Sequence, residues 1–421
     1  MRATKPIILI CLFSVVLTSL FSCGVLEDNT VYAVKESGRQ ENGFIYDVYE
    51  NNTATVTGCT LKDYAITVPD TLGGYPVTAI GEKAFDSNEG ILYVKLGKNV
   101  TTIGQRAFSS AKNLLSVSAT SELKTIESMA FMLCANLCEI KNADAVEEIG
   151  DGAFSNCSSL SYFTFSENLK TIGKEAFYYC ESLASVSLPD DVVFGKSAFA
   201  FCTSLSSLKL GKIQEIPESA FEMCTSLSSV EFSKKTTAIG QRAFRGCESL
   251  EYVNISKKIK SIGSYAFDET VWLNSMTDEF VIVGDGILLR YNGNASHVEI
   301  PKGVKFIADA FAYNENIKSV VIGNSVKTVG YSAFSGCTSL VRVTISAKVE
   351  TVEASAFSFC KGLSEIYLPK TLKTVGQSAF SNCKALTAVN YAGSPKNWSK
   401  IVFEKGNDRL LSANLNYSAK P

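Results

Sequence analysis

The dipeptide Ala-Phe recurs through most of this chain at intervals of 22 or 23 residues. One longer interval, from Phe267 to Phe311, is 44 residues and spans two periods, so the chain has fourteen registers. A period of this size is typical of a solenoid, in which each repeat forms one coil and packs only against its neighbours. The marker phenylalanines are Phe85, Phe108, Phe131, Phe154, Phe177, Phe199, Phe221, Phe244, Phe267, Phe311, Phe334, Phe357 and Phe380.

Apolar residues keep fixed positions relative to each marker. Leu or Ile stands six residues after the Phe, as at Leu160, and another apolar residue stands nine after it, as at Val186. Five residues before the Phe comes Ile, Val or Phe, usually followed by Gly. The unit is L-x-x-V-x-L-P-x-x-V-x-x-I-G-x-x-A-F-x-x-C-x-x, and its V-x-L alternation predicts a short strand with one buried face. Because one coil buries too little apolar surface to fold alone, stacking of the coils must supply the stability.

The repeat unit resembles a known family. Its L-x-x-V-x-L core matches leucine-rich repeats, and the full unit with I-G-x-x-A-F-x-x-C-x-S-L resembles the BspA-like leucine-rich repeat family of bacterial cell-surface proteins, over nearly all of residues 43–418. The resemblance implies a leucine-rich repeat solenoid of about 14 right-handed coils, with one short strand per coil in a continuous parallel sheet. The expected parts are an N-terminal cap at 43–75, a solenoid at 76–390 with a variant coil at 268–310, and a C-terminal cap at 391–421.

The first residues have the pattern of an export signal. Arg2 and Lys5 precede an uncharged stretch at 6–22, which predicts a secretory signal peptide over 1–22. A transmembrane anchor is the alternative, but seventeen residues are few for about 30 Å of hydrocarbon. The stretch LFSC resembles the bacterial lipobox, which implies lipidation of Cys23, and plain secretion is the competing interpretation. Residues 23–42 then form a tether, and the body works outside the cytoplasm, anchored to the cell membrane or outer membrane and exposed at the surface.

Cysteines occupy one slot of the repeat, three residues after the marker Phe. Stacking would align them as a ladder with one thiol per coil. A metal site needs ligands around a point rather than along a line. Disulfides between adjacent coils would satisfy the usual Cα separation, but runs of six and three are not a paired framework. The third interpretation is a small buried residue with a weak donor that caps the turn before the strand. The nine are Cys134, Cys157, Cys180, Cys202, Cys224, Cys247, Cys337, Cys360 and Cys383.

Motifs of enzymatic or metal chemistry are missing from the sequence. The lone histidine, His297, precedes a predicted strand and is expected at the surface. The stretch VGDGILL, residues 283–289, lacks the further acidic ligands of a calcium loop and predicts a tight turn between two strands. With 40 basic and 42 acidic residues, the chain has a net charge of -2, which does not favour nucleic acid or an anionic membrane. We therefore expect no catalytic residues, no metal, no cofactor and no nucleic acid partner.

One surface remains as a candidate site. In each V-x-L strand the middle residue and the residue before the Val should point out of the core, so together they tile one face of the sheet. Hydroxyl side chains dominate this face, with scattered tyrosines and a few charges. Because Tyr and Arg are enriched among the residues that dominate binding energy, the preferred ligand contacts are Tyr93, Tyr162, Tyr252, Arg342 and Tyr367.

Three functions are compatible with these features. The family resemblance implies adhesion, in which this face binds extracellular proteins or glycans of a host or neighbouring cell and the membrane is contacted only through the lipid anchor. The alternative is a structural spacer or envelope component without a ligand. A surface enzyme acting on polysaccharide is the remote alternative, because nothing in the sequence supplies its catalytic groups.

Overall fold

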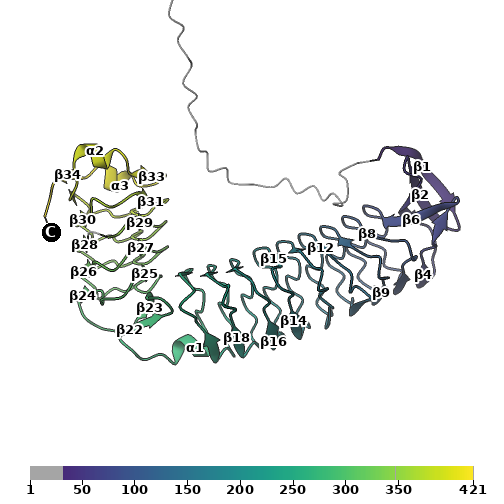
Figure 1. Ribbon diagram of the computed structural model, residues 1–421, viewed down its shortest axis with the longest axis horizontal. Coiled ribbons are helices and arrows are strands. Elements are labelled where there is room, and N and C mark those ends of the chain that lie inside the picture. The colour runs from purple at the N-terminus through teal and green to yellow at the C-terminus, as the bar shows by residue number, and fades with distance from the viewer. Residues whose placement is uncertain (1–31, 347, 421) are drawn as a thin grey trace, which may run out of the picture. The chain divides into compact units, whose positions relative to one another are not determined.

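The structure is a computed structural model that describes residues 32–346 and 348–420. Tyr32–Pro421 forms one compact unit, and the signal peptide, Cys23 and the start of the tether lie outside the described residues. Figure 1 shows a β-solenoid whose coils stack from β4 to the C-terminal elements. The predicted solenoid is confirmed, and it has about 16 turns because coils outside the first and last markers add to the fourteen registers.

The V-x-L segments form one row of parallel strands, which we call the major row. Its registers keep equivalent positions of successive coils side by side, for example Val94 beside Val117. The central residue of each strand is buried almost without exception, which confirms the predicted alternation. The strands are β4 (Ala65–Thr67), β7 (Tyr93–Lys95), β9 (Ser116–Ser118), β11 (Glu139–Lys141), β14 (Ser185–Ser187), β16 (Ser207–Lys209), β18 (Ser229–Glu231), β20 (Tyr252–Asn254), β24 (His297–Glu299), β26 (Ser319–Ile322), β28 (Arg342–Ile345), β30 (Glu365–Leu368), β32 (Ala388–Tyr391) and β34 (Asn414–Tyr417).

Each coil also has a second, shorter strand that the sequence interpretation did not include. Most of these strands end on the Ile of the Ile-Gly pair, or on the Val or Phe that replaces it, and we call them the minor row. They are β6 (Tyr75–Ile80), β8 (Thr102–Ile103), β10 (Thr125–Ile126), β12 (Glu148–Ile149), β13 (Thr171–Ile172), β15 (Val193–Phe194), β17 (Glu215–Ile216), β19 (Ala238–Ile239), β21 (Ser261–Ile262), β23 (Ile287–Tyr291), β25 (Phe306–Ile307), β27 (Thr328–Val329), β29 (Thr351–Val352), β31 (Thr374–Val375) and β33 (Val402–Phe403).

The remaining elements lie at the two ends and in the variant coil. At the N-terminal end, β1 (Val34–Glu41), β2 (Phe44–Tyr49) and β3 (Ala54–Cys59) pair antiparallel, and β5 (Thr71–Leu72) pairs with β6. Residues 34–41 were predicted as part of the tether, but they form a strand because they pair with β2. The helices α2 (Pro395–Trp398) and α3 (Asp408–Leu411) lie near the C-terminus.

The marker phenylalanines form the centre of the core. Neighbouring rings lie nearly parallel, with centroids 5.1 Å apart for Phe334 and Phe357 and 5.2 Å apart for Phe357 and Phe380. Such separations are typical of attractive aromatic pairs. One stack of nine rings runs from Phe85 to Phe267, and a second stack of four runs from Phe311 to Phe380. We refer to the coils around them as the first and second stacks.

The variant coil separates the two stacks. A strand is expected around Met276, but the chain has no strand there and forms α1 (Val271–Asn274) just before it. The N-terminus of α1 is capped by Thr270 through its Oγ1, 3.2 Å from the backbone nitrogen of Leu273. The hairpin of β22 (Phe280–Val283) and β23 follows. The turn predicted at VGDGILL is confirmed, and Asp285 at its tip pairs with Lys260 and Lys305 at 2.6 and 2.7 Å.

Hydrogen bonds join the stacks directly. The hydroxyl of Ser264 donates to the carbonyl oxygen of Tyr331 at 2.6 Å, and the backbone nitrogen of Tyr265 donates to Oδ2 of Asp309 at 2.9 Å. Burial raises the pKa of Asp309 to about 7, and the nearby carboxylate of Asp268 adds to this effect. We call this contact between the two stacks the joint. In the folded chain, the Asp309 carboxyl group at the joint therefore keeps its proton to a higher pH than an ordinary carboxyl group does.

This carboxyl group makes the joint sensitive to pH. Since its pKa is higher in the folded than in the unfolded chain, Asp309 favours folding fully below about pH 4 and loses that contribution as pH rises through about 7. The measurement is the unfolding free energy of the wild type and of Asp309→Asn, obtained by urea titration at several pH values. We expect the wild-type value minus the variant value to decrease between pH 4 and 7.5, by up to roughly 1.4 kcal/mol per pH unit. Asp268, Arg290 and Tyr265 also face this group and are unchanged in both chains. A difference that stays flat or rises over this range contradicts the assignment.

Candidate binding surface

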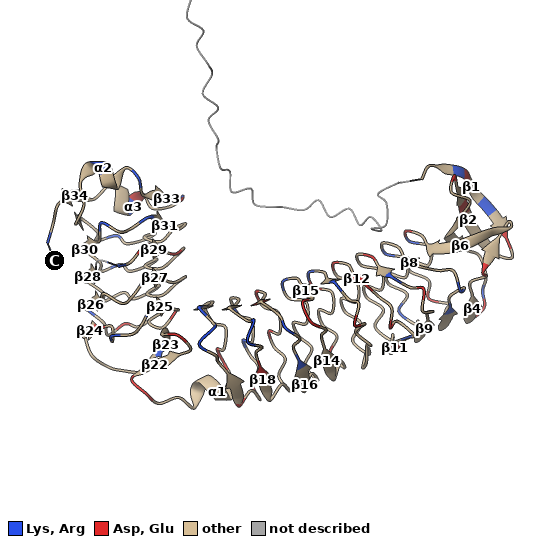
Figure 2. Ribbon diagram, viewed as in Figure 1, with Lys and Arg blue, Asp and Glu red and all other residues tan. Residues whose placement is uncertain are grey.

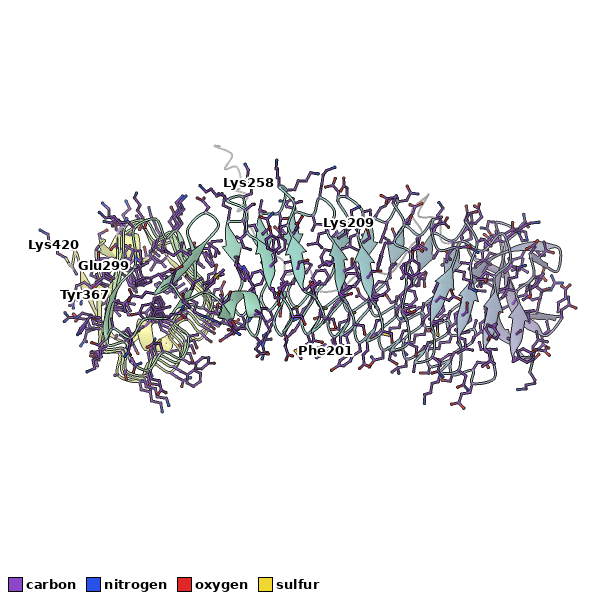
Figure 3. The ribbon with its side chains drawn as sticks, turned by 90° about the horizontal axis from the view of Figure 1, so that it is seen from below. Phe201, Lys209, Lys258, Glu299, Tyr367 and Lys420 are labelled. Carbon is purple, nitrogen blue, oxygen red and sulfur yellow. The ribbon has the colours of Figure 1, made fainter. Side chains whose placement is uncertain are left out.

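The exposed residues of the major row form the candidate surface. Figure 3 looks onto these strands in the first stack, where side chains such as Lys209 project from the sheet. Tyr93, Tyr162 and Tyr252 are 46%, 57% and 55% exposed, so all three rings are available to a partner. They are three and four coils apart, which corresponds to roughly 14 and 19 Å at a strand spacing of about 4.8 Å.

The other two predicted contacts lie together on the second stack. Arg342 and Tyr367 belong to β28 and β30, and Glu365 connects them. Nε and a terminal nitrogen of Arg342 lie 2.8 and 2.7 Å from Oε2 of Glu365. A hydrogen bond with Glu365 is the main cause that raises the pKa of Tyr367. Asn390 donates to Oε1 of the same carboxylate at 2.8 Å, so these residues form a polar cluster with defined geometry.

The face is less uniform than the sequence predicts. Tyr162 and Thr164 form no strand, and the hydrogen bonding of the major row is interrupted there, between β16 and β18, and at the variant coil. Ser116 and Asn390 were expected to point into solvent but are buried. Asn390 is covered because Asn416 of the following strand donates to its Oδ1 at 2.9 Å, in a coil beyond the last marker.

One exposed aromatic residue at the edge of this face was missed. Tyr64, which directly precedes β4, is 66% exposed, and the next residue, Ala65, pairs with Tyr93. AITVPDTLGG continues the V-x-L-P pattern one coil before the first marker, but this pattern places Ala65 and Thr67 at the outward positions and gives no signal for Tyr64. Tyr64 and Tyr93 lie on neighbouring coils and extend the aromatic surface toward the N-terminal end.

The cysteine ladder is part of the core. All nine thiols are buried and free, and each Sγ donates to the carbonyl oxygen of the marker Phe in the preceding coil at 3.0–3.3 Å. Burial raises the pKa of Cys134, Cys202 and Cys247 to about 12. These thiols are neutral at ordinary pH, so they are poor nucleophiles and poor metal ligands. The interpretation as small buried donors fits this geometry.

Some of the charged residues form ion pairs between neighbouring coils. Figure 2 shows both signs interspersed along the solenoid. Glu147, for example, pairs with Lys124 on one side and Lys170 on the other, at 3.2 and 2.5 Å. His297 is exposed, as predicted, with Nδ1 2.7 Å from the hydroxyl of Ser319. Among the described residues there is no group of three or more potential metal ligands.

The coil geometry, the strand rows and the aligned cysteine slot define a leucine-rich repeat solenoid. The profile of the BspA-type leucine-rich repeat region matches residues 78–206, 171–280 and 289–408, which together cover most of the chain. The chain therefore belongs to the BspA-type leucine-rich repeat family. No helix in the described part of the chain is both long and apolar enough to cross a membrane.

Comparison with solved structures gives related repeat proteins. A leucine-rich cell surface protein from Faecalibacterium prausnitzii is 25% identical, with a TM-score of 0.42, over 86% of this chain and 97% of that one. A leucine-rich repeat protein from Bacteroides ovatus is 21% identical, with a TM-score of 0.48, over 90% and 99%. A leucine-rich repeat protein from T. pallidum is 26% identical, with a TM-score of 0.39, over 51% and 91%. No curated protein matches the chain.

Proposed function

We propose that this chain is a cell-surface binding protein that holds an extracellular protein or glycan on the exposed face of the major row. The observation that carries the proposal is the set of exposed tyrosines, Tyr64, Tyr93, Tyr162 and Tyr252, on a scaffold whose core fixes their spacing. Aromatic rings supply large contact area at low entropic cost, and an extended solenoid face suits a partner that spans several coils. The LFSC pattern supports export and anchoring through Cys23.

The experiment is a binding screen of residues 24–421, which contain the whole compact unit, against immobilised extracellular-matrix proteins and glycans. We expect saturable binding to at least one class, because the exposed face is large and its aromatic residues are preorganised. If no ligand of the array binds, and the protein shows a cooperative unfolding transition and is therefore folded, the result would instead support a structural spacer. Loss of the membrane-bound fraction in a Cys23→Ala variant would test the anchor separately.

A further inference from the structure

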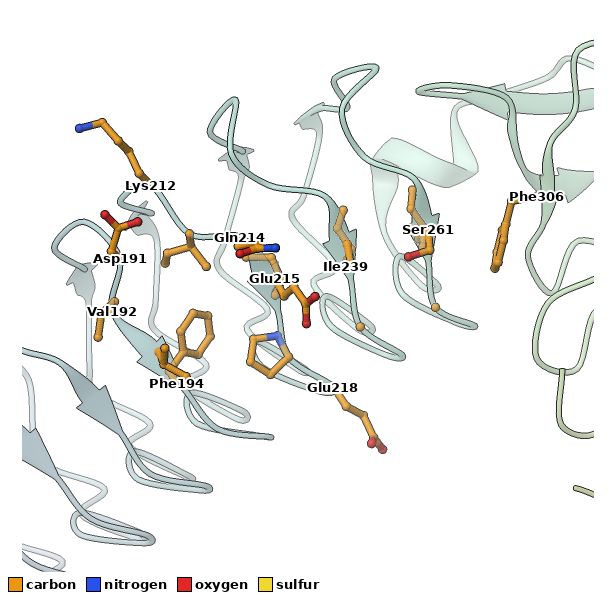
Figure 4. A pocket seen from close by; sticks show the side chains of 18 of the residues that line it. Asp191, Val192, Phe194, Lys212, Gln214, Glu215, Glu218, Ile239, Ser261 and Phe306 are labelled. Atoms are coloured by element: carbon orange, nitrogen blue, oxygen red, sulfur yellow. The ribbon is translucent and has the colours of Figure 1, made fainter. Parts of the chain in front are cut away.

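A groove lies where the first stack approaches the second. It has a volume of about 690 Å³, and residues of four successive minor-row strands, β15, β17, β19 and β21, line it together with Phe306 from the second stack. Val193, Glu215, Ala238 and Ser261 are the outward residues of those strands. Figure 4 shows Phe306 across the opening from Ser261. The groove therefore has a floor from one stack and an aromatic wall from the other.

The sequence changes at this groove. In the other two-residue strands between β8 and β31, the outward position is Thr, except for Glu148 in β12: Thr102, Thr125, Thr171, Thr328, Thr351 and Thr374. All five outward positions of the groove depart from Thr, to Val, Glu, Ala, Ser and Phe. The repeat therefore has a distinct surface where the two stacks meet, and this surface is less polar than the rest of the row, with Glu215 as its one acidic outward residue.

One carboxylate in the groove has no ion-pair partner among the residues that the structure describes. At its rim, Asp191 pairs with Lys235 at 2.7 Å. Glu218 likewise pairs with Lys196 at 2.7 Å. Glu215, on the floor, is exposed and has no ion pair or hydrogen bond from its side chain to any residue that the structure describes. A carboxylate in a concave, partly apolar site attracts a cation more strongly than one on an open surface does.

We propose that this groove binds a short basic segment of an extended polypeptide, with a lysine or arginine placed against Glu215. The apolar stem of such a side chain fits over Val193, which is 68% exposed, and over Ala238. The ring of Phe306 offers a face to the cationic group. Four strands about 4.8 Å apart span roughly 14 Å, which is the length of about four extended residues.

The groove is preformed, which lowers the cost of binding. The bonds from Ser264 to Tyr331 and from Tyr265 to Asp309 fix the two stacks beside it. Glu353, which also lines the groove, is held by the backbone nitrogen of Tyr331 at 2.9 Å. A ligand therefore has little protein to order. The site belongs to the minor row and does not depend on the proposed function of the major row.

The test uses an array of nonapeptides, each printed in four versions that differ only in the central residue: Lys, Arg, Glu or norleucine. Residues 24–421 should bind a subset of the Lys and Arg versions, and the matching Glu and norleucine versions at least tenfold less. Glu215→Gln, which removes the charge and keeps the shape, should lower the signal at least tenfold. Ser261→Phe, which fills the groove, should do the same.

Glu148→Gln is the matched control, because Glu148 occupies the same repeat position outside the groove. It should leave binding unchanged, as should Tyr162→Ala with Tyr252→Ala on the major row. Three results would overturn the proposal. The Glu-centred peptides bind as well as the Lys and Arg versions, or no peptide binds at all. The third is a Glu215→Gln variant that has the melting temperature of the wild type and binds the peptides equally well. Failure here leaves the major-row proposal untouched, since that proposal is tested by other variants and another array.

Discussion

Replacing Phe357 by Ala should destabilise the solenoid by about 3–5 kcal/mol, which is the range for truncating a fully buried aromatic side chain. Phe357 is completely buried, and its ring stacks between Phe334 and Phe380 with centroid separations of 5.1 and 5.2 Å. The neighbouring coils are held by their own hydrogen bonds and cannot collapse into the space, so the variant loses both the ring contacts and the packing around them. Urea-induced unfolding, followed by circular dichroism, measures the effect.

Phe359 is the control for this change, because it stands two residues further along the same coil and is 50% exposed. Its replacement by Ala should alter the unfolding free energy by no more than about 0.5 kcal/mol, as is usual for surface positions. Equal losses for the two variants would contradict the assignment of the marker ring to the core.

The second large effect concerns the glycine of the Ile-Gly turn. A Cβ at Gly240 would lie 2.5 Å from the backbone nitrogen of Glu218 and 2.6 Å from the carbonyl carbon of Pro217 in the preceding coil. Because both obstacles are backbone atoms, Gly240→Ala must push two coils apart and weaken the bond from its nitrogen to the oxygen of Ile216. We expect a loss of about 1–3 kcal/mol or more in unfolding free energy.

Gly323 provides the comparison, because the nearest atom to an added Cβ there is the oxygen of Ile300 at 3.4 Å. Gly323→Ala should be neutral or slightly stabilising, since it reduces the freedom of the unfolded chain. Thermal melts of the two variants, recorded side by side, test this expectation. If Gly240→Ala is as stable as Gly323→Ala, the coils have space for a Cβ at position 240, which contradicts the close contact in the structure.

The core of this fold could be predicted from the sequence because each coil repeats the same packing problem. The residues six and nine after each marker, such as Leu160 and Val186, are buried as the period requires. Equivalent positions lie side by side in neighbouring coils, so one consensus describes them all. The same logic favours an interior position for the cysteine slot, where the nine thiols are buried.

The minor row and the burial of Ser116 were missed within the periodic part of the chain, and the other departures occurred where the repeat is not periodic. The variant coil lacks a marker, and its Thr270 occupies the cysteine slot but caps α1 instead. Asn390 is buried by a coil beyond the last marker, through Asn416. The groove at Glu215 requires two stacks to meet, and sequence spacing does not predict how they are oriented. Its only sequence signal was the loss of Thr from one repeat position.

The central claim, that the major row carries the binding site, is tested most directly by the affinity of paired tyrosine variants for the ligand found in the screen. Tyr162→Ala with Tyr252→Ala removes two exposed rings of this face, whereas Tyr313→Ala removes a ring that is 68% exposed and belongs to no major-row strand. We expect the double variant to raise the Kd at least tenfold, or about 1.4 kcal/mol, and Tyr313→Ala to leave it unchanged. Equal affinities for wild type and the double variant would contradict the claim and place the ligand elsewhere on the solenoid.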